Sequence, residues 1–173
     1  MLRNSTIQVK KRWLNCGHFD YAFSHNRCAN CCRIESAAKR MESEVVKDGL
    51  SDLIADADAI FSKYVRMSAA DKNGIVKCYI CGRPERWQDS QCMHYISRAC
   101  LYLRYDLRNC KAGCKDCNEF RGGNLIKYAE KLDQESIGIT ERLYEESKLI
   151  YKPGISEIRA IVTEYTQKLN FLK

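Results

Sequence analysis

Two Cys-x-x-Cys pairs frame a single histidine in the middle of this 173-residue chain. A tetrahedral structural zinc needs four thiolates, and a site closed by four sulfurs keeps no open position for chemistry. The spacing therefore predicts a small zinc-bound scaffold, on which His94 and Asn118 are free to act. The four predicted zinc ligands are Cys78, Cys81, Cys114 and Cys117.

The remaining composition favours metal binding over disulfides. No apolar run approaches the ~20 residues that a membrane span needs, so we expect no membrane association. Residues 1–13 are basic and lack the apolar stretch of a signal peptide, which predicts an intracellular protein. Clustered cysteines in a reducing compartment more often bind metal, and an odd total of 11 cysteines cannot pair completely.

A second cysteine cluster lies near the N-terminus. Three thiols and one imidazole there match the ligand set of a structural zinc, so we predict a second zinc ion. Cys32 could substitute for its neighbour in this site. The predicted ligands are Cys16, His18, Cys28 and Cys31.

Positive charge is concentrated in the two cysteine-rich segments. Residues 1–40 carry eight Lys/Arg against two Asp/Glu, and residues 77–128 carry ten against five. Residues 41–76 and 129–173 are mildly acidic, although the whole chain has a net charge of +7. Positive potential beside a metal-organised scaffold favours a polyanion such as DNA or RNA as the partner.

A helix is predicted over residues 34–70, with Gly49 as an interruption and Ser51 as the N-cap of its second part. Apolar residues then recur at steps of three and four, as on one buried helix face. Three acidic residues near that start are expected to be solvated and to offset the helix dipole. They are Asp52, Asp56 and Asp58.

Short strands are predicted around the histidine. Residues 75–82 form one that ends in a cysteine knuckle, and residues 87–96 contain a second, with His94 near its end. Residues 99–109 alternate as a strand does, although a loop is also consistent with them. Further helices are predicted after Asn124 and towards the C-terminus, where apolar residues form a stripe.

At these motifs the chain resembles the phage NinG/Rap recombination endonucleases of the HNH (His-Me finger) nuclease superfamily. The likeness covers roughly residues 52–132, about half the chain. The runs that carry it are Cys78-Tyr-Ile-Cys81-Gly82, His94-Tyr-Ile-Ser97-Arg98, Arg104-Tyr-Asp106-Leu-Arg108-Asn109, Cys114-x-x-Cys117-Asn118 and Gly123-Asn124.

The resemblance implies a metal-dependent DNA endonuclease, encoded by a phage and acting in the host cytoplasm on branched recombination intermediates. His94 would be the general base, Asn118 would help to hold a catalytic Mg²⁺ ion, and Asn109 would brace the loop that orients His94. The zinc would be structural only. The basic residues expected to contact DNA are Arg98, Arg104, Arg108 and Arg121.

One position departs from the family pattern. Many HNH sites place an Asp or His directly before the base, and here that residue is Met93, a poor ligand for a hard cation. The relatives' Asp-Ala-Gly-His corresponds to residues 91–94 of this chain, which read Gln-Cys-Met-His. The compensating ligand stays open among Gln91, Asp89, Asp106 and Glu119, and core packing is predicted for Cys92, Cys100 and Cys110.

These expectations give an α+β fold with a zinc-bound treble-clef ββα finger in a mainly helical chain. The predicted domains are a zinc-binding segment 1–33, a helical spacer 34–74, a nuclease finger 75–135 and C-terminal helices 136–173. The alternatives are a non-catalytic zinc-finger protein that binds nucleic acid and a zinc-scaffolded protein–protein adaptor. Pairing of the C-terminal helices into a homodimer is a further expectation.

Overall fold

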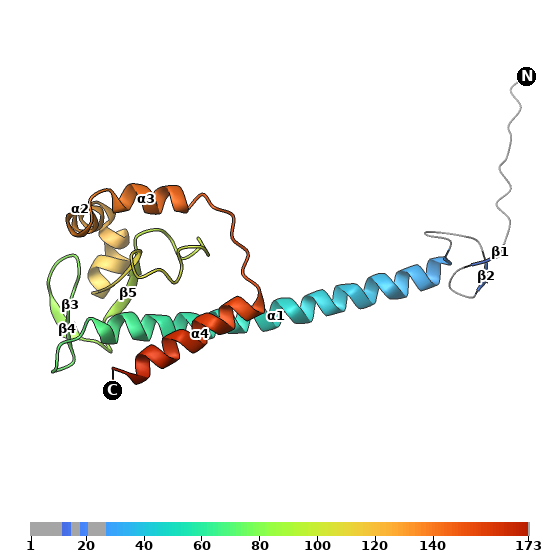
Figure 1. The fold of residues 1–173 in the computed structure, drawn as a ribbon, viewed down its shortest axis with the longest axis horizontal. Coiled ribbons are helices and arrows are strands. Elements are labelled where there is room, and N and C mark those ends of the chain that lie inside the picture. The colour runs from blue at the N-terminus through green and yellow to red at the C-terminus, as the bar shows by residue number, and fades with distance from the viewer. Residues whose placement is uncertain (1–11, 15–17, 21–26, 173) are drawn as a thin grey trace, which may run out of the picture. The chain divides into compact units, whose positions relative to one another are not determined.

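A computed structural model describes residues 12–14, 18–20 and 27–172. The chain divides into two compact units at Gly49, one formed by residues 1–49 and the other by residues 50–173. The structure has a mixed α+β composition (Figure 1). Among the described residues, no helix is long and apolar enough to cross a membrane.

The first unit contains a short antiparallel hairpin, in which β1 (Arg12–Trp13) pairs with β2 (Phe19–Asp20). Helix α1 (Ala29–Ser68) begins there and continues without a break into the second unit. The predicted interruption at Gly49 and the predicted cap at Ser51 are therefore wrong. A glycine costs a helix interior only about 1 kcal/mol relative to alanine, which long flanking helical segments can offset.

The second unit contains two antiparallel hairpins. One strand of each lies within the predicted segments 75–82 and 87–96, whereas the pairing strands at residues 84–86 and 110–113 lie outside them. In the first hairpin, Val76 of β3 lies opposite Glu85 of β4. In the second, His94 at the end of β5 lies opposite Cys110 at the start of β6. The strands are β3 (Ile75–Lys77), β4 (Pro84–Arg86), β5 (Gln91–His94) and β6 (Cys110–Gly113).

Helical segments follow the second hairpin. The π-helical turn η1 comes directly after Cys114 and Lys115, and η2 leads into α2 through Asn124, whose φ is +46°. The predicted apolar stripe of the last helix is confirmed, because Ile158 and Tyr165 are buried. The segments are η1 (Asp116–Phe120), η2 (Gly122–Asn124), α2 (Leu125–Glu135), α3 (Ile139–Glu146) and α4 (Ile155–Asn170).

Two buried clusters hold the second unit together. One surrounds the cysteine knuckles and includes Met93, Leu103 and Tyr128. The other joins the C-terminal part of α1 to β5, β6 and α4, and in it the ring of Phe61 meets the ring of Tyr165 edge-on at a centroid distance of 4.8 Å. This second cluster places one face of α1 beside the strand that carries His94.

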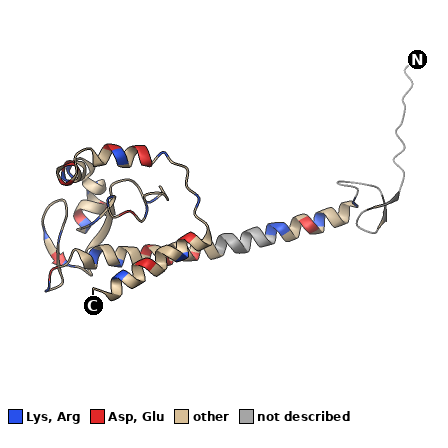
Figure 2. Cartoon of the chain, viewed as in Figure 1, with Lys and Arg blue, Asp and Glu red and all other residues tan. Residues whose placement is uncertain are grey.

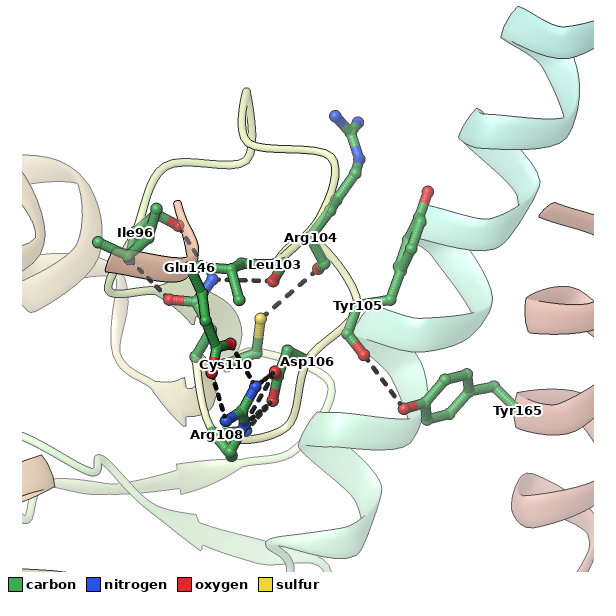
Figure 3. A network of polar contacts seen from close by, with 10 residues as sticks. Ile96, Leu103, Arg104, Tyr105, Asp106, Arg108, Cys110, Glu146 and Tyr165 are labelled. Carbon is green, nitrogen blue, oxygen red and sulfur yellow. Dashed lines mark hydrogen bonds and ion pairs between the residues drawn. The ribbon is translucent and has the colours of Figure 1, made fainter. Parts of the chain in front are cut away.

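Residues 97–109 form turns, so the loop interpretation of this segment is the correct one. Asn109 is completely buried and fixes both ends of the turn region. Its Oδ1 accepts from the Ile96 amide at 2.7 Å, and its Nδ2 donates to the carbonyls of Ile96 and Leu103, each at 3.0 Å. Figure 3 shows this network at close range.

Candidate functional site

The four cysteines of the two central knuckles meet at one point. Their sulfur atoms all lie within 4.8 Å of one another. Sγ of Cys81 and Sγ of Cys114 are 3.7 Å apart, close to the roughly 3.8 Å that sulfurs bound tetrahedrally at about 2.3 Å from zinc would show. The cluster can hold a zinc ion, as the sequence predicts.

Backbone amides prepare these thiols for a metal. The Cys117 amide donates to Sγ of Cys114 at 3.5 Å, and the left-handed Gly82, with φ at +75°, lets its amide donate to the Cys78 carbonyl at 2.8 Å. Burial would raise the pKa of Cys78, yet donors from neighbouring backbone amides lower it to about 7. A thiolate, the form that binds zinc, is therefore accessible at Cys78 near neutral pH. Burial instead raises the pKa of Cys114 and Cys117, so zinc must displace the protons of these two thiols.

The N-terminal cluster is present in part. Nδ1 of His18 lies 3.7 Å from Sγ of Cys28 and 3.4 Å from Sγ of Cys31, so three ligand atoms are gathered and can hold a metal. Cys16, the fourth predicted ligand, lies outside the described residues, and its role stays a prediction.

His94 lies in a cleft with a volume of about 550 Å³ that we call the His94 cleft. One wall is α1 and the other is formed by β5, η1 and the loop after β5. Asn118 lies in this cleft because it directly follows the second knuckle, where its amide donates to the Cys114 carbonyl at 3.1 Å. The polar lining residues are Asp58, Ser62, Arg66, Ser90, Gln91, His94, Arg98, Asn118 and Glu119.

The imidazole of His94 is anchored at one nitrogen. Its Nε2 is 3.1 Å from the Arg104 carbonyl oxygen, which can only accept, so Nε2 carries the proton. Burial lowers the pKa of His94 from its ordinary value, and the positive charge of Arg98 lowers it further, while the hydrogen bond to Arg104 opposes them. The ring is therefore neutral near pH 7, with Nδ1 unprotonated.

Three oxygen-bearing side chains form a chain across the cleft. Nδ2 of Asn118 donates to Oε1 of Gln91 at 2.6 Å, and Nε2 of Gln91 donates to the carboxylate of Glu119. Met93, by contrast, is 1% exposed and packs in the core on the knuckle side. Residue 91, rather than residue 93, is thus the strand position that faces Asn118.

The remaining candidate ligands are occupied or lie elsewhere. Asp106 makes an ion pair with Arg108 at 2.6 Å, and Asp89 does not line the cleft. Of the four open alternatives, Gln91 and Glu119 are the two that lie beside Asn118.

The prediction that Asp58 is solvated is wrong. Asp52 and Asp56 are exposed as predicted, but Asp58 is half-buried and accepts from Nε of Arg104 at 2.8 Å and from Nη2 at 2.5 Å. Although burial would raise it, the paired guanidinium holds the pKa of Asp58 below its ordinary value. A long-range partner of this kind leaves no local signal in the sequence.

The predicted DNA-contacting arginines differ in their freedom. Arg98 is exposed at the edge of the cleft, and among the described residues its side chain has no ion-pair partner. Arg104 is held by Asp58, Arg108 by both Asp106 and Glu146, and Arg121 by Asp116 at 2.9 Å. Figure 3 shows the Arg108 pairs, and Figure 2 shows acidic and basic residues interspersed along α4. DNA contact by these four residues stays a prediction.

These features define an α+β protein with cysteine clusters that can hold zinc and a polar histidine cleft beside one of them. A family model described as "Bacteriophage Lambda NinG protein" matches residues 18–173, so the chain belongs to the NinG family.

Similar curated proteins agree with this family. The chain is 29% identical over 100 residues to "Protein ninG" of Escherichia phage 933W, covering 56% of this chain and 48% of that protein. It is 30% identical over 97 residues to "Protein ninG" of Salmonella phage P22, covering 56% of this chain and 47% of that protein. The matched region thus spans about half the length of these relatives. No solved structure matches.

Proposed function

We propose that this protein is a metal-dependent DNA endonuclease of the HNH type. His94 takes a proton from water, the resulting hydroxide attacks a phosphodiester phosphorus, and the 3′ oxygen leaves. The order of the hairpin β5–β6 and the helical turn η1 supports this proposal, because a ββα finger has the same strand–strand–helix order, with His94 on β5 and Asn118 on η1.

The observation that carries this proposal is the hydrogen bond from His94 to the Arg104 carbonyl, 3.1 Å long. It fixes the tautomer and orientation of a neutral imidazole at the wall of an open cleft. A general base must be unprotonated and held in place, and this arrangement supports both requirements. Asn109 supports it as a positioning residue, since its side chain fixes the loop on which Arg104 lies.

The cleft has the donors that a hard cation needs. Mg²⁺ prefers oxygen ligands and usually keeps several waters, so two or three protein oxygens suffice. The amide oxygens of Asn118 and Gln91 and the carboxylate of Glu119 would hold it. A bound Mg²⁺ ion would offset the negative charge that develops on the phosphate and the leaving oxygen. Arg98, at the cleft edge, is placed to contact a neighbouring phosphate.

Replacing His94 by alanine tests the proposal directly. Loss of a general base costs roughly 10²- to 10⁴-fold in rate, so nicking of labelled DNA in Mg²⁺ should fall by about that factor. Affinity for the same DNA, measured by gel shift, should stay within about twofold of the wild type because phosphate contacts remain. Equal nicking by the H94A variant and the wild type would remove His94 from the mechanism.

Replacing Gln91 by aspartate tests the metal ligands. A carboxylate beside Asn118 adds the charge that the family pattern has at this position, so half-maximal nicking should need about tenfold less Mg²⁺, or ~1.4 kcal/mol. The matched control is Gln88→Asp, which adds the same charge at an exposed residue outside the cleft. A shift of the same size in both variants would mean that general electrostatics, not ligation, is responsible.

The salt dependence of binding affinity distinguishes a DNA partner from the alternative of a protein–protein adaptor. Neutralised phosphates make affinity fall linearly in log–log plots against salt, with a slope near −0.9 per contact. Binding that weakens steeply between about 50 and 200 mM salt supports a nucleic-acid partner. An affinity that does not change with salt supports a protein–protein adaptor.

We further propose branched recombination intermediates as substrates and a homodimer as the acting form. Comparison of the nicking of linear, forked and four-way DNA tests the substrate, and the mass of each complex tests the homodimer.

A further inference from the structure

A third group of metal-binding side chains lies at the His94 cleft, separate from both predicted zinc sites. Sγ of Cys92, Sγ of Cys110 and a ring nitrogen of His94 all lie within 4.8 Å of one another. The strand register produces this grouping, since Cys110 lies directly opposite His94 and Cys92 is two residues earlier on the same face of β5.

The group differs chemically from the proposed magnesium site. Two thiols and an imidazole suit soft or borderline cations such as Zn²⁺, Cd²⁺ and Cu⁺, whereas Mg²⁺ takes oxygen ligands. Ligand atoms around a tetrahedral zinc are about 3.5–3.8 Å apart, so a contraction of at most about 1.3 Å would close the site. Cys92 and Cys110 are both buried, but Cys92 and His94 line the cleft, which gives a cation a route in.

The same carbonyl that orients His94 also receives Cys110. Nε2 of His94 is 3.1 Å from the Arg104 carbonyl oxygen, and Sγ of Cys110 is 3.6 Å from it (Figure 3 shows the thiol contact). The imidazole ring has two functions: Nε2 donates the anchoring hydrogen bond, and Nδ1 is the proposed base. A metal bound between the two thiols and the ring must abolish one of them. Binding at Nε2 breaks the anchoring hydrogen bond, and binding at Nδ1 takes the lone pair that would accept a proton from water.

We propose that Cys92, His94 and Cys110 form an inhibitory site for a thiophilic divalent cation. Burial raises the pKa of Cys110, so the charge of the bound ion must displace its proton. On binding Zn²⁺, the two thiols lose their protons to solvent, no electron is transferred, and water from the cleft completes the tetrahedron. The cation occupies the general base, so excess zinc stops the reaction that Mg²⁺ supports. The existence of the site is independent of the proposed nuclease activity, but its inhibitory role rests on it.

Zinc binding by the full chain under reducing conditions tests the site itself. Native mass spectrometry should find one more zinc equivalent on the wild type than on Cys92→Ala, and the same deficit on Cys110→Ala. Cys100→Ala is the matched control, because Cys100 lies outside the three metal-binding groups. Circular dichroism identifies any variant that fails to fold. If one of Cys92→Ala and Cys110→Ala fails to fold, the zinc content of the other one tests the site. Equal zinc content in all four proteins overturns the proposal.

Nicking at fixed Mg²⁺ and rising Zn²⁺ tests the inhibitory role. The wild type and Cys100→Ala should lose activity together, whereas Cys92→Ala should need at least tenfold more zinc for half inhibition. The same inhibition in Cys92→Ala, or activation of the wild type by the additional zinc, overturns the inhibitory role. A wild type that nicks under no condition defeats the proposed function instead, while the zinc count still decides whether the site exists.

Discussion

Replacing Cys114 by serine is expected to unfold the second unit. Cys114 is 1% exposed, and its sulfur is 3.7 Å from Sγ of Cys81 in the cluster that can hold zinc. Structural zinc contributes about 10–16 kcal/mol to the folding of zinc-finger peptides, as much as the whole stability of an ordinary domain, about 5–15 kcal/mol. The cooperative thermal transition seen by circular dichroism should vanish, together with one equivalent of bound zinc.

The matched control is Cys100→Ser, since Cys100 is a half-buried cysteine outside the four-sulfur cluster, and its thiol donates to the Ser147 carbonyl at 3.8 Å. This variant should keep its zinc and lose no more than about 1 kcal/mol. Chelation of the wild type with EDTA should reproduce the Cys114→Ser result. A Cys114→Ser protein that melts like the wild type would show that the four sulfurs do not share a structural ion.

Replacing Asn109 by alanine is expected to destabilise the protein by about 3–5 kcal/mol. The side chain is completely buried and makes three hydrogen bonds, so its loss removes the partner that it gives to the Ile96 amide and to the Ile96 carbonyl. The Leu103 carbonyl loses one of two donors and keeps the Asp106 amide at 3.3 Å. Each such buried group costs roughly 1–3 kcal/mol, only partly recovered by local relaxation or water. Urea denaturation measures the change, with unaltered m-value as the sign that folding stays two-state.

The control for this variant is Asn73→Ala, at an exposed turn residue, which should change stability by less than about 0.5 kcal/mol. Asn109→Asp is a sharper comparison, because it keeps the acceptor for the Ile96 amide but removes the donor to both carbonyls. A loss below about 1 kcal/mol for Asn109→Ala would mean that the loop is held by other contacts.

Local patterns were sufficient to predict the cysteine knuckles, the strand that ends at His94 and the apolar face of the last helix. Each depends on spacing within a few residues, which the sequence displays directly. The continuity of α1 through Gly49 was not predictable in this way, because a single glycine weakens a helix without stopping it.

Long-range partners account for the rest. Asp58 and Arg104 are 46 positions apart and form an ion pair that no periodicity indicates. Likewise, the family pattern alone does not decide whether residue 91 or residue 93 faces the cation site. Burial in the structure decides it. Met93 packs in the core, whereas Gln91 accepts a hydrogen bond from Asn118, which lies 27 positions later in the sequence. The grouping of Cys92, His94 and Cys110 depends on the register of β5 and β6, which the sequence does not specify.

The central claim is that a zinc ion bound by the four knuckle cysteines holds a scaffold on which His94 and an oxygen-lined cation site share one cleft. Anomalous scattering from a crystal of the reduced, zinc-loaded protein soaked in Mn²⁺, which shares the oxygen preference of Mg²⁺, tests it most directly. The account predicts a manganese peak bonded to oxygens of Asn118 and of Gln91 or Glu119, and zinc among the four knuckle sulfurs. Manganese bound only outside the His94 cleft, or knuckle sulfurs that share no zinc, would contradict it.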